Sequence, residues 1–199
     1  MGFIFEQGDF ERFIDESTNS RLNRARSTVD PIYETNIFGY KKTTVFISHK
    51  HDDLQDLKGI LSYLEKEYNV TVYIDSKDPN MPKVTSEETA RNIKNRIEMC
   101  DKFILLATNA AVDSKWCNWE LGYGDAQKFS HGDIAIFPLK SKNSDYKGSE
   151  YMALYPYIEY ETGTSENIYG EQIKKGLYVV TENDGKRKFI PLSSWLSNS

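Results

Sequence analysis

The sequence turns apolar at Thr44-Val45-Phe46-Ile47-Ser48, a run of β-branched and aromatic residues bounded by polar segments. Three further runs of the same kind follow along the chain, at residues 70–75, 102–107 and 134–138. Each run is nearly continuous rather than alternating, which is typical of strands that helices cover on both faces. The runs therefore predict the parallel strands of an α/β sheet.

The intervals between these runs carry residues at helical spacing. A stripe of apolar residues follows the first run, with Asp52 or Asp53 available as the helix N-cap. A capping box at residues 85–88 opens a second helix, and Asp113 or Ser114 opens a third. Strands that alternate with helices imply right-handed crossovers between parallel strands. We therefore predict a flavodoxin-like, doubly wound parallel sheet of about five strands.

The segments on either side of a domain at residues 43–140 are expected to form extensions. Residues 1–42 are polar and charged, and their apolar positions recur only loosely, so we expect a partly helical N-terminal extension outside the core. Residues 141–199 predict a C-terminal extension with a strand near 155–160 and a hairpin that turns at Asp184-Gly185.

The composition argues against several classes of partner. The 199 residues are 39% hydrophobic and carry a net charge of -5, which disfavours binding to nucleic acid or to anionic lipid. No apolar run approaches the length of a membrane span, so we expect no membrane segment. The two cysteines, Cys100 and Cys117, have neither a metal-ligand spacing nor a disulfide-scaffold spacing, which favours a reducing, cytoplasmic location.

The candidate site residues lie where the predicted strands end. Ligands of such sheets bind beyond the carboxyl ends of the strands, and Ser48, His49 and Asp75 follow the first two runs there. The helix after the third run carries Trp116 and Glu120, whose i to i+4 spacing places an indole and a carboxylate on one face. On spacing alone, a solvated carboxylate beside a core aromatic is the commoner arrangement, and a catalytic carboxylate is the alternative.

A carboxylate beside an indole suits the cleavage of an N-glycosidic bond to a planar, cationic base. Such cleavage builds positive charge on the ribose as an oxocarbenium ion, which a carboxylate stabilises or traps. The nicotinamide of NAD is already a pyridinium and leaves as a neutral molecule, so that one carboxylate can suffice. The indole offers a face on which a cationic ring or an adenine can stack. This chemistry makes Glu120 the candidate catalytic residue.

The order of the motifs resembles the TIR domain in its bacterial form, over residues 43–140. Val-Phe-Ile-Ser-His and Val-Tyr-Ile-Asp are followed by a proline-bearing loop, by Phe-Ile-Leu-Leu-Ala-Thr and by Ser-Lys-Trp-Cys-Asn-Trp-Glu. The most specific part of the match is the run from Trp116 to Glu120, which is similar to the WxxxE pattern of NAD-consuming TIR domains.

The resemblance implies roles for the residues at this edge of the sheet. Glu120 would be the catalytic residue, and Trp116 would shape the wall that binds the base. Ser48 and His49, in the loop after the first strand, would border the nucleotide, as would Asp75 at the start of the family's BB loop. The resemblance implies no metal and no cofactor, because NAD is the substrate.

The implied activity is that of an NAD+ nucleosidase or ADP-ribosyl cyclase, which yields nicotinamide together with ADP-ribose or a cyclic ADP-ribose isomer. Free-standing TIR domains of this kind resemble the TIR component of Thoeris-like anti-phage systems, in which the product is an immune signal. The expected partners are therefore NAD, other TIR domains through self-assembly into an oligomer, and a separate effector protein that the product reaches.

Two other functions stay open at this point. One is a non-catalytic TIR interaction or adaptor module in which Glu120 is structural, and the other is a related nucleoside N-glycosidase or deoxyribosyltransferase. Smaller motifs favour ordinary structural roles. His49 and His51 are expected to be solvated loop histidines rather than metal ligands, and Cys117 a packed residue rather than a reactive thiol. Gly122-Tyr123-Gly124 is expected to allow close packing or to end a helix.

Overall fold

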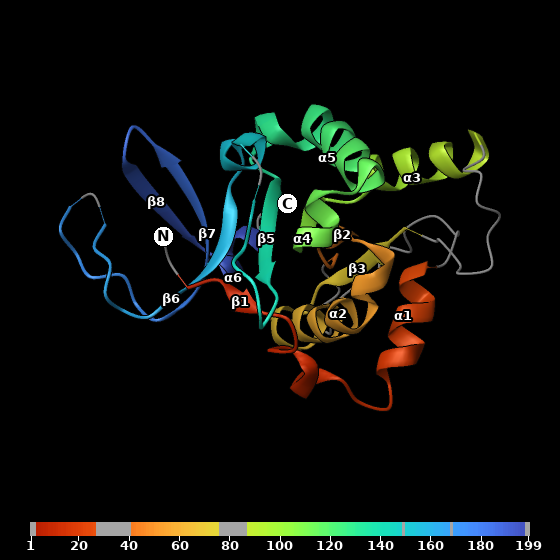
Figure 1. Cartoon of the computed structure of the whole chain (residues 1–199), viewed down its shortest axis with the longest axis horizontal. Helices are drawn as coiled ribbons and strands as arrows, with labels where there is room; N and C mark the ends of the chain where they lie inside the picture. Colours follow the sequence, from red (N-terminus) through yellow and green to blue (C-terminus); the bar gives the residue numbers. More distant parts are fainter. Residues whose placement is uncertain (1–2, 27–40, 76–86, 149, 168, 198–199) are drawn as a thin grey trace.

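The computed structural model describes residues 3–26, 41–75, 87–148, 150–167 and 169–197. They form a mixed α/β fold in which helices flank a central, mostly parallel sheet (Figure 1). The order of the strands across this sheet is β3 (Thr71–Ile74), β2 (Thr44–Ser48), β4 (Lys102–Ala107), β5 (Ile134–Lys140), β6 (Tyr157–Glu161), β7 (Gly176–Asn183) and β8 (Lys186–Pro191).

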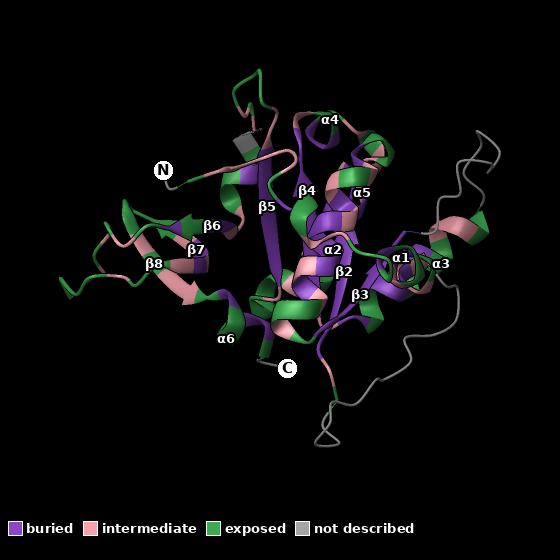
Figure 2. Cartoon of the chain, turned by 90° about the horizontal axis from the view of Figure 1, so that it is seen from below, coloured by how far each residue is buried: buried purple, intermediate pink, exposed green. Residues whose placement is uncertain are grey.

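The strands from β3 to β6 pair in parallel, so that the predicted doubly wound architecture is confirmed. The register places Phe46 of β2 beside Phe103 of β4, and Ile136 of β5 beside Tyr157 of β6. Every residue of β2, β3 and β4 is buried (Figure 2), because helices lie on both faces. This two-sided burial explains why these strands read as continuous apolar runs.

An antiparallel hairpin extends the sheet beyond β6. Strands β7 and β8 pair with each other, and β7 also pairs with β6. The turn between them is made by Asp184 and Gly185, whose φ values are 50° and 71°. Aspartate followed by glycine adopts these positive φ values readily, and they match the twist of a two-residue hairpin. The hairpin therefore lies where the Asp-Gly pair predicts it.

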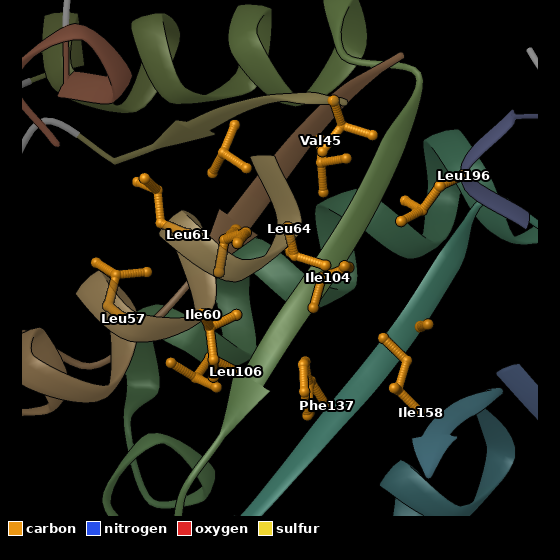
Figure 3. Packing of buried hydrophobic residues seen from close by; sticks show 14 of the residues in the cluster. Val45, Leu57, Ile60, Leu61, Leu64, Ile104, Leu106, Phe137, Ile158 and Leu196 are labelled. Atoms are coloured by element: carbon orange, nitrogen blue, oxygen red, sulfur yellow. The ribbon is translucent and has the colours of Figure 1, made fainter. Parts of the chain in front are cut away.

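One face of the sheet is covered by α1 (Thr18–Arg26), α2 (Leu54–Tyr68) and α6 (Leu192–Ser197). Figure 3 shows how the apolar stripe of α2 packs on the strands, with Leu57, Ile60, Leu61 and Leu64 in one cluster with Ile104, Leu106 and Phe137. Among the described residues, no helix is both long enough and apolar enough to cross a membrane.

The other face carries α3 (Glu87–Met99), α4 (Asn109–Val112) and α5 (Lys115–Lys128). Helix α5 lies close to β4, because a Cβ atom on Gly124 would be 2.9 Å from the ring of Phe103. The close-packing role predicted for this glycine is therefore confirmed. Beside these helices, the connection from β5 to β6 covers the sheet, and its short helix η4 (Glu150–Leu154) adds Met152 to the core.

The N-terminal segment contributes to the core, and the expectation that it lies outside is wrong. Strand β1 (Phe5–Glu6) pairs with β5, with Phe5 beside Leu139. Phe10 and Leu22 are buried in the same cluster as α2. A Cβ atom at Gly59 of α2 would lie only 2.6 Å from the carbonyl oxygen of Phe10. The backbone of the N-terminal segment therefore packs directly against α2 at this glycine. A few apolar residues suffice for this contact, which is why the segment shows little periodicity.

Candidate active site

The fold brings Glu120 and Ser48 together at the carboxyl edge of the sheet. Ser114 caps α5, since its side chain accepts a hydrogen bond from the backbone N–H of Cys117 at 3.3 Å, and Glu120 follows on the second turn. Ser48 is the last residue of β2, and its hydroxyl donates a hydrogen bond to Oε2 of Glu120. Both residues are fully buried, at 0% exposure. A carboxylate so far from water needs such a donor to offset its desolvation.

His49 and Asp75 form a second buried pair at the same edge. Nδ1 of His49 lies 3.4 Å from Oδ1 of Asp75, and each side chain is 5% exposed. Burial lowers the pKa of His49, and the charge of Asp75 opposes this shift only in part. The imidazole is therefore neutral at pH 7. The expectation of solvated histidines holds for His51, which is exposed, and is wrong for His49, which is buried.

A small pocket opens beside these groups. Its volume is about 90 Å³, and its lining includes His49, Asp75 and Trp116 but neither Ser48 nor Glu120. The last two residues lie next to the lining, because Ser48 precedes His49 and Glu120 is one turn beyond Trp116. Pockets for small molecules are usually larger, at about 300 Å³ or more. The loop predicted after Asp75 and the first half of the predicted capping box fall at residues 76–86, outside the described residues.

Trp116 is held in place by a row of stacked rings on the outer side of α5. Its ring lies 4.7 Å from that of Trp119 at an angle of 27°, and Trp119 stacks in turn with Tyr123 at 6.3 Å. The ammonium group of Lys94 lies 5.1 Å from the ring centroid of Tyr123. Such stacking fixes the plane of an indole. Trp116 therefore offers a pre-oriented aromatic wall to the pocket.

Cys117 lines the pocket as a packed thiol. The residue is 1% exposed, and burial raises the pKa of its thiol to about 11, although the hydrogen bond with Ser114 opposes this rise; the charge of Glu120 adds a smaller rise. A thiol with such a pKa is protonated at neutral pH and is a poor nucleophile. The expectation of a packed residue is therefore confirmed.

Metal binding at His49 and His51 would need further ligand side chains close to both. In the described part of the chain, no three His, Cys, Asp or Glu side chains gather as a metal site would require. The carboxylate of Asp75 lies beside His49, while His51 is exposed at the rim of the same pocket. The pair His49 and His51 therefore does not form a metal site with other described residues.

Asp53 and Thr108 are a further buried pair that the sequence does not reveal. Asp53 occupies the N-cap position before α2, but its carboxylate makes no capping hydrogen bond and instead accepts one from the Thr108 hydroxyl at 2.5 Å. Burial raises the pKa of Asp53 to about 6, and the bond from Thr108 limits the rise. The two residues are 55 positions apart, so no local motif links them. Both lie at the edge of the sheet, beside the candidate site.

Comparisons with known proteins identify the family. The sequence profile described as "TIR domain" matches residues 45–175. A protein of Bacillus cereus (strain MSX-D12), provisionally named 3′ cyclic ADP-D-ribose synthase ThsB′, is 32% identical over 159 residues, which cover 78% of this chain and 76% of the relative. A second relative, from Cytobacillus dafuensis and provisionally named cyclic ADP-D-ribose synthase TIR2, is 30% identical over 95 residues.

The coverage of these matches differs. The second relative is matched over 46% of this chain but only 25% of its own length. A crystal structure of a prokaryotic SEFIR domain overlays 55% of this chain and 76% of its own, with 16% identity and a TM-score of 0.40, a low similarity. The profile and the first relative each cover most of the chain. The chain belongs to the TIR domain family.

Proposed function

We propose that the chain is a TIR enzyme that cleaves the N-glycosidic bond between nicotinamide and ribose in NAD, with Glu120 as the catalytic carboxylate. The observation that carries the proposal is the position of this side chain. Glu120 is fully buried on α5, bonded to Ser48, and one turn beyond the indole that lines the pocket. The names of the two relatives, both described as cyclic ADP-ribose synthases, support the same substrate.

In the proposed reaction, the nicotinamide ring stacks on the indole of Trp116 in the pocket. The bond from the anomeric carbon of the ribose to the ring nitrogen breaks, and its electron pair neutralises the pyridinium as nicotinamide leaves. The carboxylate of Glu120 stabilises the positive charge that develops on the ribose. His49 is neutral at pH 7 and contacts the nucleotide as a hydrogen-bonding group, with its position set by Asp75.

The product depends on which group attacks the ribose next. Attack by water gives ADP-ribose, whereas attack by a hydroxyl or ring nitrogen of the same molecule gives a cyclic isomer. We propose a cyclic product, because both relatives are named as cyclases. By the same resemblance, the product would act as an immune signal in anti-phage defence, reach a separate effector protein, and be made by a self-assembled oligomer of TIR domains.

The proposed chemistry requires Glu120 to become accessible. In the structure, the carboxylate lies behind the lining of the pocket, and Ser48 holds one of its oxygens. Substrate has to reach the carboxylate, so that turnover includes a step in which the lining of the pocket opens over Glu120. Such conformational steps commonly limit the rate of enzymes.

The experiment that tests the proposal compares NAD turnover by the wild type and by Glu120→Gln, with products separated by chromatography and identified by mass. Loss of the charge should lower turnover by about 100-fold or more. Glu98→Gln is the matched control, because Glu98 also accepts a hydroxyl hydrogen bond, from Tyr123, but lies at the surface. Equal turnover by the wild type and Glu120→Gln would rule out the catalytic role.

The second candidate is a non-catalytic interaction module. The observation that favours it is the complete burial of Glu120, because a carboxylate that is bonded and fully covered also suits a structural role. In that case Glu120→Gln would lower the thermal stability, and the wild type would release no nicotinamide at any protein concentration that allows self-assembly. Release of nicotinamide that depends on Glu120 excludes this candidate.

A further inference from the structure

A second, larger pocket lies on the face of the sheet that carries α3 and α5, beyond the end of this helical layer. Strands β6, β7 and β8 continue the sheet on the far side of β5 from these helices (Figure 1). There the connection from β5 to β6 lies over the sheet and leaves a pocket of about 610 Å³. This volume is in the usual range for small-molecule sites, about 300 to 1,000 Å³.

The floor and one wall of this pocket are apolar. Ile136 and Pro138 of β5 form the floor, Ile4 borders it, and Met152 with Ala153 of η4 form the wall. Met152 is buried, whereas Ala153 is exposed at the mouth. A surface of this kind binds the apolar body of a ligand, since burial of each Å² of apolar area contributes about 25 cal/mol.

Two tyrosine rings complete the apolar part. Tyr146 comes from the connection and Tyr157 from β6. Burial raises the pKa of Tyr146 to about 12, and it also raises the pKa of Tyr157. Both phenols therefore stay neutral in the cell and present the π faces that attract organic cations.

The far end of the pocket is acidic. Glu159, Glu182 and Asp184 contribute to its lining, and none of the described lining residues is basic. Arg187 donates hydrogen bonds to Glu159 and to the Tyr157 hydroxyl, and so balances one of the three carboxylates. Two negative charges remain at the end of an otherwise apolar pocket. A cation near them is attracted both by these charges and by the tyrosine rings.

We propose that this pocket binds a small organic ammonium compound, with its apolar body on Ile136 and Met152 and its positive charge toward Glu182 and Asp184. The pocket shares no lining residue with the one at His49 and Trp116. NAD does not suit it, because the two carboxylates repel a pyrophosphate. The site is therefore distinct from the candidate active site, and its ligand is of opposite charge to the proposed substrate's phosphates.

The test is a titration followed by NMR of protein labelled at its Met and Ile methyl groups. The probe is tryptamine, an aromatic ammonium ion, and tryptophol is its neutral isostere. Tryptamine should shift the Met152 and Ile136 signals saturably, and tryptophol should bind at least about tenfold more weakly. Ala153→Trp, which fills the mouth from an exposed position, should abolish the shifts.

A variant without the two carboxylate charges provides a second test of the proposal. Glu182→Gln with Asp184→Asn removes the two charges at constant volume, and Asn accepts the positive φ of 50° at position 184. It should weaken tryptamine about tenfold and leave tryptophol unchanged. Glu16→Gln with Glu67→Gln, two exposed residues outside this lining, is the matched control and should change neither.

Three results would overturn the proposal: no saturable shift with tryptamine, shifts that persist in Ala153→Trp, or equal affinity for tryptamine in the charge variant and the wild type. None of these measurements uses NAD. A failure here therefore leaves the proposed reaction at Glu120 untouched, and a failure of that reaction leaves this site untouched.

Discussion

The two pockets of the molecule differ in a way that volume alone does not reveal. The pocket at Trp116 has about 90 Å³ and adjoins fully buried polar groups, Ser48 and Glu120. The pocket at Met152 has about 610 Å³, yet its charged groups lie at one end of an apolar surface. Glu159 at the larger pocket is also buried, but Arg187 balances its charge, whereas Glu120 is bonded to the uncharged hydroxyl of Ser48. Chemistry is therefore expected at the smaller pocket and binding at the larger.

The largest effect expected from a substitution other than at Glu120 itself is that of Ser48→Ala. It removes the hydroxyl that donates to Glu120 and leaves a buried oxygen without this donor. NAD turnover should fall at least about tenfold, because the carboxylate loses its position, and stability should fall by about 1–3 kcal/mol. Steady-state kinetics and urea unfolding measure the two effects.

Ser62→Ala is the matched control for this prediction. Ser62 is also fully buried and shares a hydrogen bond of 3.0 Å with Thr18, but on the opposite side of the sheet, against α1. It should cost similar stability and leave turnover unchanged. If both variants lose turnover in proportion to their stability, the buried polar groups at the smaller pocket have no special role.

A second effect is expected at Gly124, where α5 packs against β4. Gly124→Ala puts a methyl group 2.9 Å from the Phe103 ring, so the helix or the ring has to move. The net loss should be about 1–2 kcal/mol, since overpacking outweighs the better helix propensity of alanine. Turnover should fall as well, because the same helix carries Glu120.

Gly122→Ala provides the internal reference, because nothing lies within 4 Å of a Cβ atom at that position. It should stabilise the protein by about 1 kcal/mol through helix propensity alone. Thermal melts of the two variants measure the difference. Equal melting temperatures would mean that the contact between Gly124 and Phe103 does not hold α5 against β4. This contact would then not explain why the wall of the smaller pocket is rigid.

A third effect concerns pH. The folded pKa of Asp53 is raised from 3.8 to about 6, so that the folded state binds this proton more tightly than the unfolded state. Its contribution to stability is therefore present below about pH 4 and is lost as pH rises toward 6. Asp53→Asn should remove this dependence, a difference of the order of 1 kcal/mol between pH 4 and 7. Urea unfolding across this range tests it.

Titration of His49 changes the stability in the opposite direction over the same pH range. Its folded pKa is lowered from 6.5, so the unfolded state binds the proton first and stability falls as pH drops below 6.5. The comparison of wild type with Asp53→Asn cancels this common contribution. If the two proteins show parallel stability curves from pH 4 to 7, Asp53 does not titrate as a buried group.

The smallest effect is expected at the element that lies between the two pockets. Tyr151 of η4 donates a hydrogen bond to Asn118 of α5, two residues before Glu120, while Met152 lines the larger pocket. Tyr151→Phe should cost less than about 1 kcal/mol, because the hydroxyl is at the surface. NMR shifts of the Asn118 side-chain amide on addition of tryptamine should be smaller in this variant. Identical shifts in both proteins would show that the Tyr151 hydroxyl does not link the two pockets.

The sequence predicted the elements whose signals are local. The apolar runs located β2 to β5, and the i to i+4 spacing of Trp116 and Glu120 identified a face of α5 that the structure places at the sheet edge. Asp-Gly located the hairpin. These signals depend on hydrogen-bonding and steric preferences within a few residues, which a single sequence contains.

The contacts that the sequence did not predict join distant residues. Ser48 and Glu120 are 72 positions apart, and Asp53 and Thr108 are 55 apart, so no periodicity connects them. The burial of His49 likewise depends on Asp75 from another strand. The larger pocket lies under a connection without regular periodicity, where side chains such as Ile136, Met152 and Glu182 are brought together only by the fold. The roles of Ser48, His49 and Asp75 toward a nucleotide stay predictions.

The pairing of β1 with β5 has a consequence for the order of folding. Phe5 and Phe10 are made before their aromatic partner Phe137, which emerges only after more than a hundred further residues. Until then, Phe10 can contact Tyr63 of α2, but β1 lacks β5, the strand with which it pairs. Long-range pairing of this kind is slow, and it leaves apolar surface exposed on the nascent chain. Strand β1 is thus made well before β5 and can reach its place only after β5 has emerged.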